Sequence, residues 1–129
     1  MAVVVDASAI AAIAFGEPEG VTIAAHLEGE TLLAPALLDV ELTNVAVKKV
    51  RKHPEMLENV TLCLLAALRL PITRVAVPVG EVFALAQHAG LTAYDACYLW
   101  LARARDAELV TLDSSLARLA DELRRPIPR

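Results

Sequence analysis

The stretch Ala-Val-Val-Val-Asp-Ala-Ser, residues 2–8, decides the fold class of this chain of 129 residues. Its apolar, β-branched run Ala2–Val5 has no polar alternation, which is typical of a strand buried on both faces at the centre of a parallel sheet. The run Ala7–Phe15 that follows is helical in pattern, and Gly16 ends it. A buried strand that leads directly into a helix indicates an α/β fold.

Strands and helices alternate along the rest of the chain. Three further strands are expected at Thr31–Ala34, Ile72–Val77 and Glu108–Leu112. Helices are expected at residues 18–28, 36–53, 54–70, 79–89, 92–106 and 114–123. This order predicts a three-layer α/β/α sandwich with a short, mostly parallel central sheet, built as a single domain over residues 1–129.

The composition predicts a cytoplasmic protein with reduced thiols. Hydrophobic residues make up 57% of the chain, but the longest apolar runs have seven residues, whereas a membrane span needs about 20. The sequence does not begin like a signal peptide, and Cys63 and Cys97 lie in helical apolar patterns, which disfavours a disulfide framework or a zinc site. The net charge of −4 disfavours a basic nucleic-acid coat protein but allows an enzyme that reaches nucleic acid through metal ions.

Two acidic residues follow predicted strands at the point where each strand ends. Asp6 follows the first strand and Asp113 follows the last. Functional groups gather outside the carboxyl ends of strands in open α/β sheets, so we expect both carboxylates at the same edge of the sheet. The alternative for each is a simple role as the cap of the next helix.

Two further acids lie on predicted helices. Glu41 falls inside the apolar stripe of helix 36–53, where a carboxylate is costly unless it is paired or bound to a metal; a position at the rim or an ion pair is the alternative. Asn44, one turn on, is either a second polar group of the site or an ordinary hydrogen-bonding helix residue. Asp95 lies three residues after Thr92, where a capping role is the alternative to metal binding.

Four carboxylates that converge cannot all ionise without raising a pKa, and a hard divalent cation relieves the repulsion. Ligands that are all oxygen suit Mg²⁺ or Mn²⁺. The sequence has no Gly-rich phosphate loop and no Gly-x-Ser-x-Gly motif, and its three histidines are scattered. We therefore predict one or two metal ions at a site formed by Asp6, Glu41, Asp95 and Asp113.

Four motifs, taken together, resemble those of PIN-domain ribonucleases of the VapC toxin type: Asp6-Ala-Ser8, Glu41-x-x-Asn44, Thr92-Ala-Tyr-Asp95-Ala and Thr111-x-Asp113. The resemblance covers about residues 3–116, with all four acidic motifs in the family's order. It implies an Mg²⁺- or Mn²⁺-dependent endoribonuclease that is the toxin of a toxin–antitoxin pair, usually a homodimer, and is held inactive by a cognate antitoxin.

Carried over by motif, the four acids match the family's acidic quartet, and Ser8 and Thr111 match its supporting hydroxyl positions. Many members carry a further acid and then an aromatic residue after the last motif, where this chain has Ser114-Ser115-Leu116. That departure counts against a fully occupied second metal site.

The expected reaction is hydrolysis of an RNA phosphodiester by water that the metal activates, with the ion held mainly by Asp6 and Asp95. One basic cluster is a candidate RNA-binding edge, although it would also compensate the dipole at a helix C-terminus: Lys48, Lys49, Arg51 and Lys52. Leu57–Leu70 is apolar around most of its circumference, so we expect it to contact another subunit or the antitoxin, with a central core helix as the alternative.

Two other functions are compatible with parts of the pattern. A catalytically degenerate PIN-like module would bind nucleic acid or protein without cleavage, but the presence of all four acids disfavours it. A phosphoacceptor receiver or a phosphatase would use Asp6 or Asp113. A receiver needs a late lysine, and none follows Lys52; a two-acid phosphatase usually has Asp-x-Asp after the first strand, and here the residues are Asp-Ala-Ser.

Overall fold

The computed structural model describes residues 1–124 and has a four-stranded sheet with the order β3-β2-β1-β4. Its strands are β1 (Ala2–Val5), β2 (Thr31–Pro35), β3 (Ile72–Val75) and β4 (Glu108–Val110). Every pair of neighbours in the sheet is parallel, so all four carboxyl ends lie at one edge. The central strand β1 buries Val4 and Val5 completely, as its unbroken apolar run predicts.

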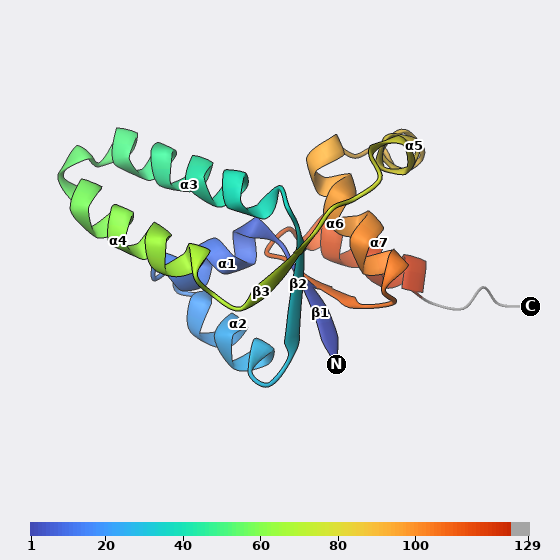
Figure 1. The fold of residues 1–129 in the computed structure, drawn as a ribbon, viewed down its shortest axis with the longest axis horizontal. Coiled ribbons are helices and arrows are strands. Elements are labelled where there is room, and N and C mark those ends of the chain that lie inside the picture. Colours follow the sequence, from blue (N-terminus) through green and yellow to red (C-terminus); the bar gives the residue numbers. More distant parts are fainter. Residues whose placement is uncertain (125–129) are drawn as a thin grey trace, which may run out of the picture.

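Helices cover both faces of the sheet. They are α1 (Ala7–Ala14), α2 (Gly20–Leu27), α3 (Leu38–Lys52), α4 (Leu57–Leu68), α5 (Val79–Ala89), α6 (Ala93–Ala104) and α7 (Ser114–Arg124). Figure 1 shows α1 to α4 on one side of the sheet and α5 to α7 on the other, which confirms the predicted three layers. Within residues 1–124, no helix is long and apolar enough to cross a membrane.

Several expected elements differ at their ends, among them the helix over residues 54–70 and strands β3 and β4. The helix expected over residues 54–70 is split into a short 3-10 helix, Pro54–Met56, and α4. Strand β3 ends at Val75, because its partner in β2 is Pro35, the last residue of that strand. Strand β4 ends at Val110, because the next amides donate to side chains: Leu112 N to Ser8 Oγ (3.0 Å) and Asp113 N to Thr111 Oγ1 (3.0 Å).

Two contacts fix helices around the sheet. Gly20, at the start of α2, lies so close to α1 that a Cβ atom would overlap the backbone carbonyl of Ala12. On β3, the guanidinium of Arg74 donates from Nη2 (2.8 Å) and Nε (3.2 Å) to Asp39 Oδ1. Because Asp39 lies in the first turn of α3, this ion pair anchors the part of the helix that carries Glu41.

Candidate functional site

One pocket at the carboxyl edge of the sheet is lined by all four predicted carboxylates. It has a volume of about 560 Å³, and its walls come from the junction of β1 and α1, from α3, from the start of α6 and from the segment before α7. Its polar and charged lining residues are Asp6, Ser8, Glu41, Asn44, Lys48, Tyr94, Asp95 and Asp113. Residues far apart in the sequence therefore face one cavity. Figure 1 shows α3 and α6, which contribute to its walls, on opposite sides of the sheet.

Two hydroxyl groups hold the side chain of Asp6. Its Oδ2 atom accepts hydrogen bonds from Thr111 Oγ1 (2.6 Å) and Ser8 Oγ (3.2 Å). Asp6 precedes α1, but its side chain makes no capping hydrogen bond there. Asp6 is only 7% exposed. The two hydroxyl donors, rather than a capping role, explain why a carboxylate is buried at this point.

The capping alternative holds in part for Asp113. Its Oδ1 atom accepts from the backbone amides of Ser115 (2.9 Å) and Leu116 (3.1 Å), which begin α7. One carboxylate oxygen therefore caps the helix, while the residue also lines the pocket. The two roles are compatible because they use different parts of one side chain.

The cap of α6 does not require the carboxylate of Asp95. Thr92 is the capping residue, and its hydroxyl accepts from the backbone amide of Asp95 (3.2 Å). The side chain of Asp95 is thus left to face the pocket. Burial raises the pKa of Asp95, and the negative charges of Asp6 and Asp113 raise it further.

Glu41 is half-buried on α3 and faces the same charges. Burial raises the pKa of Glu41, and the charges of Asp6 and Asp95 add to this, while the nearby Tyr98 hydroxyl works in the opposite direction. Glu41 Oε1 and the hydroxyl oxygen of Tyr98 are nevertheless buried with no partner in hydrogen-bond geometry among the described residues. Burial and the Glu41 carboxylate raise the pKa of Tyr98, so the phenol stays neutral.

These features fit a hard divalent cation by donor chemistry and by charge. The donors are carboxylate oxygens, the acids repel one another, and one oxygen of Glu41 is buried without a partner. Over residues 1–124, however, no three acidic, histidine or cysteine side chains are placed to hold one ion together. Mg²⁺ commonly binds through one or two carboxylates and keeps several waters, so it does not need a preassembled set of protein ligands.

The four residues of the predicted basic cluster lie in different surroundings. Lys48 lines the carboxylate pocket. Lys49 instead pairs with Glu17 (Nζ to Oε1, 2.6 Å) and lies over the ring of Phe15. Arg51 lines a separate groove between α3 and α4, and Lys52 is exposed. Only the first of the four therefore lies at the site in this structure.

Sequence reasoning missed two tyrosines of the site. Tyr98 is fully buried, and its hydroxyl lowers the pKa of Glu41 against the effect of burial. Its spacing of three residues from Asp95 on one helix was the signal for a shared face. Tyr94 lines the pocket and is 61% exposed; its position directly before Asp95 was the only indication in the sequence.

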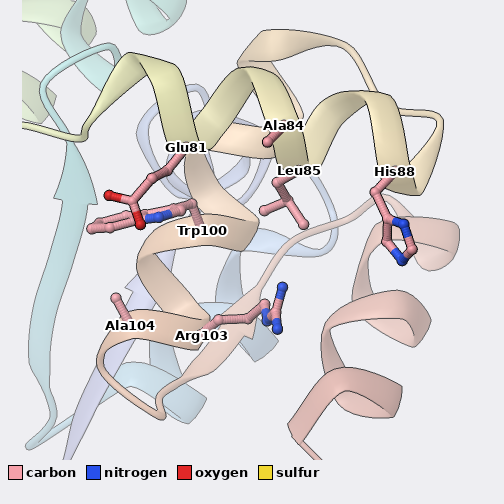
Figure 2. A pocket seen from close by; sticks show the side chains of 7 residues that line it. All are labelled: Glu81, Ala84, Leu85, His88, Trp100, Arg103 and Ala104. Carbon is pink, nitrogen blue, oxygen red and sulfur yellow. The ribbon is translucent and has the colours of Figure 1, made fainter.

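A second cavity of about 570 Å³ lies between α5 and α6, so size alone does not identify the site. Figure 2 shows its lining side chains, Glu81, Ala84, Leu85, His88, Trp100, Arg103 and Ala104. Glu81 is the single carboxylate among them. The chemistry of this cavity is therefore mixed, and the concentration of acidic groups distinguishes the pocket at the sheet edge.

Comparison with known proteins supports the fold and identifies the family. The structure is similar to the crystal structure of PAE2754 from Pyrobaculum aerophilum, with a TM-score of 0.70 and 29% sequence identity over 95% of this chain and 98% of that chain. No protein of curated function matches the sequence significantly. Residues 3–122 match the PIN domain family. With a match over nearly all of its length, the chain belongs to the PIN domain family.

Proposed function

We propose that this protein is a metal-dependent endoribonuclease and the toxin of a type II toxin–antitoxin pair of the VapC type. PIN domains are generally nucleases, which gives the broad reaction class. The observation that most supports the finer proposal is the pocket lined by Asp6, Glu41, Asp95 and Asp113 at the carboxyl edge of the sheet. We place the activity in the cytoplasm, where RNA is available and where free Cys63 and Cys97 would stay reduced.

Asp6 and Asp95 are the proposed main ligands of an Mg²⁺ or Mn²⁺ ion. When bound, such an ion supplies polarisation of the scissile phosphate and a lowered pKa for water. The hydroxyls of Ser8 and Thr111 fix the orientation of the Asp6 carboxylate, because both donate to its Oδ2 atom. Asp113 is the fourth carboxylate of the pocket, and the amides at the start of α7 fix its orientation.

Glu41 is the proposed proton acceptor. Its pKa is raised above that of an ordinary carboxylate, which suits a group that takes a proton from attacking water. Asn44 lies one turn further along α3 and lines the same pocket, where its amide is placed to bind substrate or water. In-line attack of water on the phosphate would leave a 5′-phosphate and a 3′-hydroxyl.

The toxin role requires partners, and α4 is the proposed contact surface for a homodimer and for the antitoxin. Leu57, Leu62 and Leu65 of this helix are exposed. Apolar grooves run along both sides of α4, one against α3 and one against α1. Helix α4 therefore does not have the surroundings of a central core helix, which was the alternative considered for this segment.

The decisive experiment is a cleavage assay on total cellular RNA with the purified protein. We expect fragments with 5′-phosphate ends in Mg²⁺ or Mn²⁺ and no fragments when a chelator is added. RNA that is bound but left intact at every metal concentration would instead support a degenerate binding module. Cleavage that continues in the chelator would contradict the role of the metal.

A further inference from the structure

The aromatic ring of Tyr94 is a part of the pocket that the proposed reaction does not use. Tyr94 follows the cap of α6, lines the carboxylate pocket and is 61% exposed. Phe83 on α5 is similarly exposed, at 64%, but it does not line that pocket. What distinguishes Tyr94 is therefore its place beside the acids rather than its exposure, since single exposed apolar side chains are ordinary on protein surfaces.

Lys48 supplies positive charge on the opposite wall. It is the one basic side chain among the described residues that line the pocket. Within residues 1–124 it makes no ion pair, whereas its neighbour Lys49 is paired with Glu17. Lys48 lies about two turns from Glu41 along α3, a rise of roughly 10 Å along the helix, and its ammonium group is free to bind an anion at the pocket.

These two side chains come from helices on opposite faces of the sheet. Lys48 is on α3, as is Glu41, and Tyr94 is on α6, as is Asp95. The other two acids, Asp6 and Asp113, follow strands β1 and β4. Figure 1 shows the two helices on either side of the carboxyl edge. An RNA strand that crossed the pocket from one helix to the other would therefore have a cation on the α3 wall, an aromatic ring on the α6 wall and carboxylates on both.

We propose that Tyr94 and Lys48 bind the RNA strand on the two sides of the cleaved bond. This inference rests on the nuclease function proposed above and assigns its substrate contacts. Tyr94 stacks on the base next to the scissile phosphate, and Lys48 binds a flanking phosphate of the same strand. Because a base must leave its own stack to lie on Tyr94, the pair selects unpaired RNA at the cleaved position.

The test uses a single-stranded oligoribonucleotide in which 2-aminopurine replaces one base at a time. Binding is followed in Ca²⁺, a hard cation that takes oxygen ligands, and cleavage of the same oligonucleotides is followed in Mg²⁺ and Mn²⁺. We expect stacking on Tyr94 to quench the fluorophore at one position beside the cleaved bond. The variant Tyr94→Leu should abolish that quenching and weaken binding by about 5- to 100-fold, whereas Tyr94→Phe should retain both.

Matched variants test whether the effects on binding are specific to the ring of Tyr94 and the charge of Lys48. Phe83→Leu removes an equally exposed ring away from the pocket and should leave binding unchanged. Lys48→Ala should weaken binding and reduce the slope of log Kd against log salt by about 0.7, the value for one phosphate contact on a single strand. Arg105→Ala, which removes one charge at the far end of α6, should keep the wild-type slope.

The outcomes distinguish this inference from the proposed function. Position-specific quenching that depends on Tyr94, without cleavage in either metal, would overturn the nuclease and leave the strand contacts standing. Cleavage with unchanged binding and quenching in Tyr94→Leu would overturn the strand contacts alone. A protein that neither binds nor cleaves the oligonucleotides would overturn both.

Discussion

Asp95 is the side chain whose replacement best separates a metal ligand from a helix cap. The capping bond uses the hydroxyl of Thr92 and the backbone of Asp95, so Asp95→Asn leaves it intact. Under the proposed function, the loss of one negative charge should lower the cleavage rate by orders of magnitude. The melting temperature should hold or rise, because repulsion from Asp6 and Asp113 is relieved.

A melting curve in a chelator and a cleavage rate in Mg²⁺, both on one purified preparation, check this expectation. Thr92→Ala is the complementary control, because it removes the cap and leaves the carboxylate. It should lower stability by about 1 kcal/mol while the folded protein still cleaves. Wild-type cleavage by Asp95→Asn would contradict the metal role of Asp95.

Glu41 predicts a pH dependence of the metal-free protein. Its pKa is higher in the folded than in the unfolded chain, so the folded state binds more protons and the ionised side chain lowers the free energy of unfolding at neutral pH. Glu41→Gln should therefore be more stable than the wild type at pH 7. The difference should shrink as the pH falls through the raised pKa, and should be gone below the ordinary value of 4.5.

Denaturant unfolding in a chelator, at several pH values from 7 to 4, measures this difference directly. Lys52→Gln is a suitable comparison, because it changes the charge of an exposed residue outside the pocket. A stability difference for Glu41→Gln that grows toward acid pH would show that the carboxylate is stabilised, rather than destabilised, by the fold.

The packing of α2 on α1 depends on a residue with no side chain. In Gly20→Ala, the new Cβ would overlap the carbonyl oxygen of Ala12, and the two helices would have to separate. We expect a loss of about 1–3 kcal/mol in the free energy of unfolding. Gly80→Ala is the matched control, because nothing lies within 4 Å of its Cβ position in α5; that change should be neutral or stabilise the protein by up to about 1 kcal/mol.

Helices and strands were predictable where the pattern was strong and less so at their ends. The buried run of β1 and the glycine that ends α5 place those elements correctly. The ends of β3 and β4 were not predictable, because they depend on partners distant in the sequence: Pro35 opposite Val75, and Ser8 for the amide of Leu112. A single sequence contains no direct signal for either contact.

The acids of the site could be named from their positions, but their surroundings could not. Asp6 and Asp113 both precede helices, yet only Asp113 caps one. The difference arises because Thr111, more than a hundred residues from Asp6, donates to that carboxylate. The sequence likewise gives no information about which carboxylate the buried hydroxyl of Tyr98 would approach.

For the complete protein, the exposed apolar face of α4 predicts self-association. We expect the wild type to sediment as a dimer, and Leu62→Glu with Leu65→Glu to sediment as a monomer with an unchanged helix signal in circular dichroism, because two charges cannot be buried unpaired at an interface. Val21→Glu, at another exposed apolar position, on α2, should remain dimeric. A wild type that stays monomeric over a wide range of concentrations would refute the dimer.

The position of β4 beside β1 also sets the moment during synthesis at which the pocket can first exist. Asp6 is translated before all seven helices described, but Thr111 and Asp113 follow β4, after six of those helices. A nascent chain that has not released β4 from the ribosome has neither the hydroxyl that orients Asp6 nor the last carboxylate of the pocket. Translation order therefore delays the assembled pocket, and with it the proposed attack on RNA, until β4 and the residues that follow it have left the ribosome.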